Sequence, residues 1–297
     1  MVKLLKSKKD INFYLDDFME YCTLKDLSKK TLNSYESTLM LFIKYLEEEY
    51  QIVDIQKVKK DHIEDYIDFT KNRGKYSFVS DEKTIKINHP EYRKDFGKEI
   101  STSTINNHLR NIKVFFNYCY EKKYIKSNLV DKLKFVKTKR KMKDEITDSE
   151  FKALIKAINV TIYSEYRDYT IIQLIFDTGM RLSETFFSNT MANILRKWLQ
   201  YKDRYCNSDY LFPKNGKIIT ASNFGRNFRM YVNKPITAHC LRNNFAKRFL
   251  LSGGDIFMLS KILGHSSVTV TEQAYLDVTM SDIRKSYQRY SPLESMK

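Results

Sequence analysis

A run of basic residues near the middle of the chain divides it in two. In residues 132–143, seven of the twelve are Lys or Arg and none is acidic. Like charges at this density repel one another and resist compact packing, so the run predicts an extended linker that lies along a phosphate backbone. A solvated basic loop without a ligand is the alternative. Either way the run predicts a boundary between two domains, residues 1–131 and 144–297, each long enough to bury a core.

Four segments before the linker have the apolar spacing of amphipathic helices. In each of them apolar residues recur every three or four positions, which is the pattern of a helix with one buried face. The segments are Ile11–Tyr21, Leu32–Leu46, Asp61–Asn72 and Ile105–Cys119. We therefore expect the first domain to be a bundle of about four helices.

Residues 74–100 interrupt this helical pattern. Tyr76, Phe78, Ile85 and Ile87 alternate with other residues on either side of the polar stretch 80–83. Such alternation is typical of strands with one buried face, so the segment predicts a β-hairpin inserted in the bundle. Its lysines and Arg93 could contact DNA, and a solvated excursion is an equal alternative.

After the linker, capping signals predict where the helices begin and end. Thr147 and Glu150 form a capping-box sequence before an apolar run, and residues 169–176 are expected to form a buried helix that ends near Gly179.

The last part of the chain carries a second set of such signals. Thr237 is expected to cap a helix whose positive N-terminus carries His239 and Arg242, where a phosphate would be favoured. Asp255 is expected to cap a short helix that Gly264 can end in the left-handed conformation.

The overall charge points to a polyanionic partner. The chain has 52 Lys and Arg against 36 Asp and Glu, a net charge of +16, and 42% hydrophobic residues, so it is expected to be folded and to bind nucleic acid. No apolar run approaches the length of about 20 residues that a membrane-spanning helix needs, and the N-terminus does not resemble a secretory signal. The four cysteines have neither metal-ligand nor disulfide-framework spacing, so a cytoplasmic protein without a metal is expected.

Five polar residues in the second half form a candidate catalytic set. They are Arg181, His239, Arg242, His265 and Tyr275. Guanidiniums can grip two oxygens of a phosphodiester and stay protonated, and imidazoles can donate to the same oxygens or accept a proton. A phenol activated by such neighbours can attack phosphorus and conserve the bond energy in a covalent phosphotyrosine. This chemistry requires neither metal nor cofactor.

The contexts of these residues resemble the tyrosine site-specific recombinase, or phage integrase, family. The resemblance covers most of the chain and rests on three boxes and a tyrosine. The boxes are Thr-Gly-Met-Arg-Leu-Ser-Glu at 178–184, His-Cys-Leu-Arg at 239–242 and Leu-Gly-His-Ser-Ser at 263–267, and the tyrosine is Tyr275. The resemblance implies that Tyr275 is the nucleophile and that the other four residues activate the phosphate. It also implies a SAM-like core-binding domain before the linker. Asn243 departs from the family, which often has His after the second arginine.

A larger departure lies between the first two boxes. Family members follow the first arginine box with a strand pair whose turn carries a lysine, taken to protonate the departing 5′ oxygen. Here Glu184 and Thr185 run directly into 186–198, which resembles the segment after that strand pair. The catalytic lysine is therefore expected to be absent. Lys214 and Lys217 lie in a later turn that the family has separately, so neither replaces it convincingly.

Together these observations predict a mainly α, two-domain DNA clamp with a reduced or missing small β-sheet. The expected activity is DNA integration or transposition for a mobile element, through a covalent 3′-phosphotyrosine, by an oligomer assembled on double-stranded DNA. Lys137, Lys139, Arg140 and Lys141 of the linker are expected to bind DNA. One alternative is a remnant that binds DNA without cutting it. Another is a basic RNA-binding protein, disfavoured because the chain has only eight glycines and no RNA-recognition motif.

Overall fold

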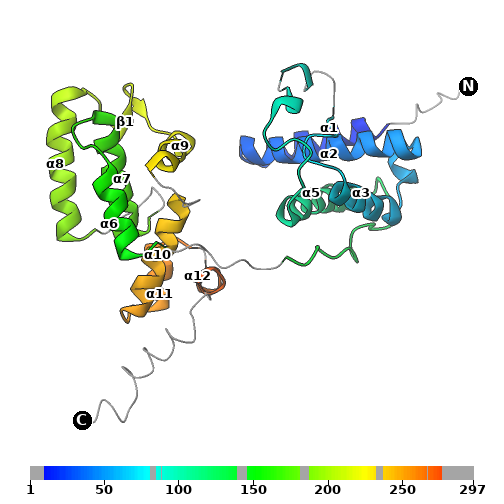
Figure 1. Ribbon diagram of the computed structural model, residues 1–297. Coiled ribbons are helices and arrows are strands. Elements are labelled where there is room, and N and C mark those ends of the chain that lie inside the picture. Colours follow the sequence, from blue (N-terminus) through cyan, green and yellow to red (C-terminus); the bar gives the residue numbers. More distant parts are fainter. Residues whose placement is uncertain are drawn as a thin grey trace, which may run out of the picture. The chain divides into compact units, whose positions relative to one another are not determined.

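The computed structural model describes residues 10–80, 85–87, 89–138, 146–180, 187–231, 237–265 and 267–275. The chain divides into two compact units, Met1–Arg140 and Lys141–Lys297 (Figure 1). Among the described residues, no helix combines the length and apolar character needed to cross a bilayer.

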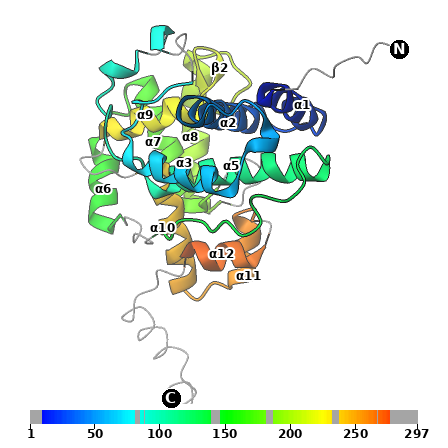
Figure 2. The ribbon, with the colours of Figure 1, turned by 90° about the vertical axis from the view of Figure 1, so that its right-hand side faces the viewer.

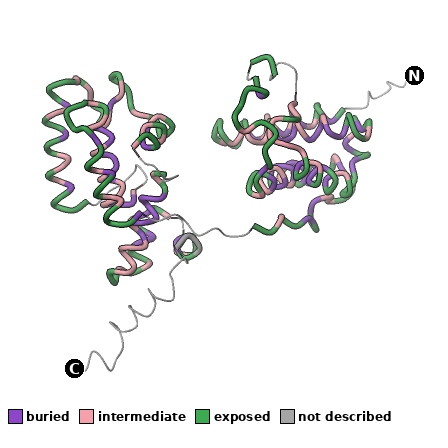
Figure 3. The backbone as a smooth tube through the Cα atoms, viewed as in Figure 1, coloured by how far each residue is buried: buried purple, intermediate pink, exposed green. Residues whose placement is uncertain are grey.

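The first unit contains the expected helical bundle. Its long helices are α1 (Ile11–Leu24), α2 (Lys29–Tyr50), α3 (Lys60–Asn72) and α5 (Thr102–Glu121), with the short 3₁₀ helix η1 (Ile55–Lys57) before α3. The helix α5 packs against α1, α2 and α3, and the buried faces point inward (Figures 1 and 3). Aromatic rings fill the centre of the core, among them Phe18, Phe42, Tyr66, Phe115 and Phe116. The prediction of four helices from apolar spacing is confirmed.

The prediction of a β-hairpin within residues 74–100 is wrong. The described residues of this segment form turns, a helical stretch at 85–87 and the 3₁₀ helix η2 (Pro90–Tyr92), and they contain no strand. The alternating pattern predicted that Ile85 and Ile87 lie on one buried face of a strand. Both side chains are exposed in the structure, Ile87 to 75%. Without a covered apolar face, a strand pair here would lack the packing that stabilises it.

Main-chain hydrogen bonds join the two ends of segment 74–100 instead. The amide of Lys75 donates to the carbonyl of Lys98 at 2.8 Å, and the amide of Gly97 donates to the carbonyl of Lys75 at 2.9 Å. A Cβ on Gly74 would lie 2.5 Å from the Cα of Gly97, so the two backbones can meet only because Gly74 has no side chain.

The start of the basic run packs on the first unit. Leu133 is buried, and Lys113 Nζ donates to its carbonyl at 2.9 Å. The Asn106 side chain pairs with the main chain of Val136 in both directions, each bond 2.9 Å long. Leu133 and Val136 of the run dock this part against the bundle. Residues 139–145 lie outside the described residues, and the boundaries expected at 131 and 144 stay a prediction.

The second unit is built around α7. Its first elements are α6 (Asp148–Ala157), α7 (Tyr163–Thr178), α8 (Asn189–Tyr205), the strands β1 (Pro213–Lys214) and β2 (Lys217–Ile218), and α9 (Ala221–Tyr231). The helix α7 contacts α8, α9 and α10 (Ala238–Leu251). Among the described residues these two antiparallel strands are the whole β-structure, which confirms the expected reduction of the small sheet.

Helix ends follow the predicted capping signals. Thr147 and Glu150 form the capping box of α6, and Gly179 ends α7 with a φ of 61°. Thr237 caps α10, and the carboxylate of Asp255 accepts two amides of α11 (Ile256–Ile262). The helices α11 and α12 (Val268–Tyr275) pack on α10 (Figure 2).

Candidate active site

The guanidinium of Arg242 is the centre of the site that the structure describes. Arg242 lies on α10 and is only 4% exposed. Its Nη1 donates to the carbonyl of Gly179 at 2.6 Å, and its Nη2 donates to the carbonyl of Leu263 at 2.7 Å. Gly179 and Leu263 are the C-terminal caps of α7 and α11. The negative ends of two helices therefore hold this buried cation, which fixes its position before any ligand arrives.

Gly179 allows these elements to come together. A Cβ at this position would lie 2.3 Å from a ring carbon of Phe245 and 3.1 Å from a methyl of Leu263. The positive φ of Gly179 also disfavours any residue with a side chain. The close approach of α7 to α10 and α11, and with it the bond to Arg242, depends on this glycine.

The structure brings His265 into direct contact with Arg242. The Nη2 of Arg242 lies 3.0 Å from His265 Nε2, and His265 Nδ1 lies 2.7 Å from Thr271 Oγ1 on α12. The amide of His265 donates to the carbonyl of Ser260, which ties the residue to α11. Two of the five predicted residues thus form one hydrogen-bonded unit of the kind suited to binding a phosphate.

The structure describes the other three predicted residues less completely. His239 is exposed on the first turn of α10, three residues before Arg242. Tyr275 is the last residue of α12, and its side chain is not described. Arg181 lies outside the described residues, two positions after Gly179, whose carbonyl accepts from Arg242.

The connection between α7 and α8 is short. Thr178 ends one helix and Asn189 begins the next, and the amide of Ser188 donates to Asp177 Oδ2 at 2.9 Å. This bond brings the two ends of the connection together. Residues 181–186 lie outside the described residues, and the sequence of the connection, residues 179–188, contains no lysine.

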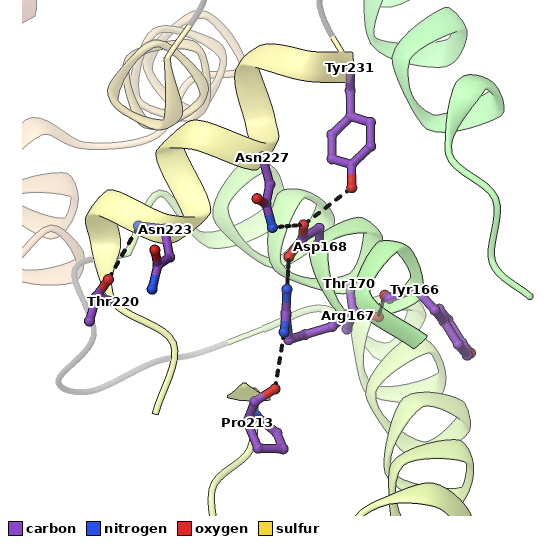
Figure 4. Close-up of polar contacts among 9 residues, drawn as sticks. All are labelled: Tyr166, Arg167, Asp168, Thr170, Pro213, Thr220, Asn223, Asn227 and Tyr231. Atoms are coloured by element: carbon purple, nitrogen blue, oxygen red, sulfur yellow. Dashed lines mark hydrogen bonds and ion pairs between the residues drawn. The ribbon is translucent and has the colours of Figure 1, made fainter. Parts of the chain in front are cut away.

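Lys214 ends β1 and Lys217 begins β2, so the two lysines flank the turn and form a pair in the strand register. A buried polar network fastens this turn to α7 (Figure 4). Arg167 on α7 donates from Nη1 to the carbonyl of Pro213 at 3.1 Å. Its Nε and Nη2 both donate to Asp168 Oδ1, at 3.1 and 3.0 Å.

The same carboxylate holds α9. Asp168 Oδ2 accepts from Asn227 Nδ2 at 2.8 Å and from the hydroxyl of Tyr231 at 3.2 Å, as Figure 4 shows. Burial, and next the charge of Asp168, raise the pKa of Tyr231 well above its usual value, so this hydroxyl stays a donor. One buried carboxylate therefore joins α7, α9 and, through Arg167, the basic turn.

Several contributors to the site were not found from the sequence. Thr271 and the carbonyls of Gly179 and Leu263 all hold the Arg242 and His265 pair. Carbonyls leave no trace in a sequence. Only the spacing of Thr271, four residues before Tyr275 and so on the same helix face, could have indicated a link. Among the described residues, no group of three or more His, Cys, Asp or Glu is placed to hold a metal ion.

Two family models match this chain. The phage integrase family matches residues 184–282, and the phage integrase N-terminal SAM-like domain matches residues 15–86. Together they match more than half of the chain. The first range includes His239, Arg242, His265 and Tyr275 and begins three residues after Arg181.

Relatives and solved structures agree with these matches. Tyrosine recombinase XerD of Oceanobacillus iheyensis is 22% identical over 95% of this chain and 99% of its own length. Tyrosine recombinase XerC of Leptospira interrogans is 22% identical over 96% of this chain and 95% of its own.

The structural likeness shows a shared fold. The Tn1549 transposon integrase in complex with a circular intermediate DNA has a TM-score of 0.65 at 17% identity, covering 94% of this chain and 98% of its own. The λ integrase tetramer bound to a Holliday junction has a TM-score of 0.62 at 13% identity, covering 91% of this chain and 78% of its own. The chain belongs to the tyrosine site-specific recombinase, or phage integrase, family, whose members cut and rejoin DNA.

Proposed function

We propose that this protein recombines DNA site-specifically through a covalent 3′-phosphotyrosine on Tyr275. The observation that carries the proposal is the contact between Arg242 and His265, held by two helix ends next to the helix that ends at Tyr275. A preorganised guanidinium beside an imidazole can stabilise the charge that develops on the non-bridging oxygens of a phosphodiester under attack.

The proposed roles follow from residue chemistry and position. Arg242 and Arg181 grip the non-bridging oxygens. His265 donates to them from Nε2 once a phosphate oxygen replaces its contact with Arg242 and Nε2 takes up a proton, because in the DNA-free protein Nε2 accepts from that guanidinium. His239, exposed on the positive first turn of α10, shares this task or accepts the proton of the phenol. Attack by Tyr275 forms the bond from its oxygen to phosphorus and breaks the bond to the 5′ oxygen, which takes its proton from water where no lysine supplies one. The free 5′ hydroxyl of a strand reverses the step and restores the phenol.

Double-stranded DNA is the proposed ligand. The net charge of +16 favours a polyanion, and exposed basic side chains lie next to the site-bearing elements, namely Lys217 on β2 and Arg226 and Arg229 on α9. The Arg167 and Asp168 network holds both elements on α7. The DNA present in the integrase complexes of this fold supports the same ligand.

The biological setting that fits best is the movement of a mobile element. The likeness to the Tn1549 transposon integrase and to λ integrase, the latter a tetramer on its junction, supports integration or transposition by an oligomer assembled on DNA. A protein that recombines the DNA of a mobile element in this way works in the cytoplasm.

Covalent trapping tests the proposal. The protein is incubated with nicked suicide DNA that carries the ends of its own element, and adducts are separated on a denaturing gel. We expect an adduct on the 3′ phosphate at Tyr275 and, for Tyr275→Phe, unchanged DNA affinity without an adduct. An adduct that persists in Tyr275→Phe would assign the nucleophile to another tyrosine. DNA binding without any adduct in the natural protein would favour the non-cutting remnant.

A further inference from the structure

Thr271 is an unassigned member of the site. It lies on α12, its side chain is fully buried at 0% exposure, and its Oγ1 is 2.7 Å from His265 Nδ1. The other ring nitrogen of His265 faces Arg242 at 3.0 Å. The imidazole therefore lies between a guanidinium on α10 and a hydroxyl on α12.

These two contacts determine where the proton of the imidazole sits. A guanidinium has only donors, so His265 Nε2 must accept from Arg242 and cannot carry a proton in this arrangement. The proton of the neutral ring is then on Nδ1, and Nδ1–H donates to Thr271 Oγ1. A partner on one ring nitrogen fixes both the tautomer and the orientation of a histidine.

The same bond joins the imidazole to the helix of the nucleophile. Thr271 and Tyr275 are four residues apart on α12, which is about one helical turn. We infer that Thr271 is a positioning residue, which holds the Nδ1–H of His265 and thereby fixes the register of α12, and of Tyr275, relative to Arg242. The part of this inference that concerns Tyr275 rests on the proposed function.

A purely structural role for Thr271 gives different results. A buried hydroxyl that only fills space would affect folding stability, and its loss would leave the proton on His265 Nδ1 as it was. A hydroxyl that accepts this proton shields it from exchange with water. The two roles therefore separate in the behaviour of one imidazole proton and do not require activity to be measured.

Nuclear magnetic resonance of the DNA-free protein with ¹⁵N-labelled histidine tests the first half. The chain has five histidines, and His265→Gln identifies the signals of His265. We expect a protonated Nδ1 with a slowly exchanging proton and an unprotonated Nε2 in the natural protein. Thr271→Val keeps the shape and removes the acceptor, so the proton signal should disappear, whereas Thr271→Ser should retain it. Thr269→Val, at an exposed position of the same helix, is the matched control and should change nothing. An unprotonated Nδ1 in the natural protein, or an unchanged signal in Thr271→Val, overturns the inference.

The rate of covalent adduct formation tests the second half. At metal-binding histidines, removal of the outer partner of the imidazole typically costs about 10- to 100-fold, and His265 is held by a partner of the same kind. We expect Thr271→Val to slow adduct formation by about this factor at unchanged DNA affinity, with the rate restored in Thr271→Ser. A natural rate in Thr271→Val refutes the link to Tyr275. If the natural protein forms no adduct at all, the proposed function fails, and the imidazole proton alone decides the role of Thr271.

Discussion

The buried carboxylate of Asp168 should contribute more to the free energy of unfolding of the second unit than any exposed charged side chain of that unit. Asp168→Asn keeps the shape of the side chain and removes its charge. It leaves the guanidinium of Arg167, which is 3% exposed, without its counterion. It also introduces an NH₂ group, a donor, at the place where Asn227 and Tyr231 now both donate to the carboxylate. Four hydrogen bonds to one carboxylate are weakened or broken.

The magnitude follows from the burial of both partners. Removal of one partner of a buried ion pair typically costs about 3–5 kcal/mol, because the other charge stays buried and uncompensated. In a unit of this size, 1 kcal/mol lowers the melting temperature by about 2–4 °C. We therefore expect the second unit of Asp168→Asn to melt roughly 10 °C lower, as measured by calorimetry or by near-ultraviolet circular dichroism.

A matched control lies in the same unit. Asp148 pairs with Arg248 at 2.5 Å, but their side chains are 71% and 42% exposed. Asp148→Asn removes the same charge from an aspartate paired with an arginine and should cost about 1 kcal/mol or less. A double-mutant cycle with Arg167→Met should show non-additivity of about 0.5–3 kcal/mol, since each single change already breaks the pair. Equal costs for Asp168→Asn and Asp148→Asn, or additive costs in the cycle, would refute the reasoning.

Three further predictions concern pH, salt and the missing lysine. Burial, and next the charge of Arg73, lower the pKa of His108 to about 4, whereas an unfolded histidine titrates near 6.5. As pH falls through this window the unfolded chain takes up the proton first, so the first unit should lose about 3 kcal/mol. In urea titrations the stability difference between the natural protein and His108→Gln should shrink by this amount, and parallel curves would contradict it. Neutralising the four basic linker residues should flatten the slope of log affinity against log salt by up to ~0.9 for each phosphate that the linker no longer neutralises, and an unchanged slope would remove the linker from the interface. If the general acid is absent, DNA with sulfur in place of the 5′ bridging oxygen should be cleaved about 10²–10⁴-fold faster than ordinary DNA, because a thiol leaves without being protonated. Equal and fast cleavage of both would show that a lysine supplies the proton.

Local signals in the sequence predicted the elements and the candidate chemistry. Apolar spacing located the helices of the first unit, and caps such as Thr147, Thr237 and Asp255 located helix starts in the second. These signals work because a helix buries one periodic face and must satisfy its own first amides, both of which depend on residues a few positions apart. The boxes around Arg242 and His265 likewise indicated the family before any geometry was known.

The tertiary structure decided what depends on contacts between distant residues. The alternation in 74–100 predicted strands, but Ile85 and Ile87 found no surface to cover them, and strand formation depends on packing more than on local preference. The partners of Arg242 are main-chain carbonyls 63 and 21 residues away, and those of Asp168 lie 59 and 63 residues away on α9. Carbonyls are present at every residue, so only the fold determines which of them face a guanidinium. The proton of His265 is decided in the same way, since it follows from Arg242 on one side of the ring and Thr271 on the other.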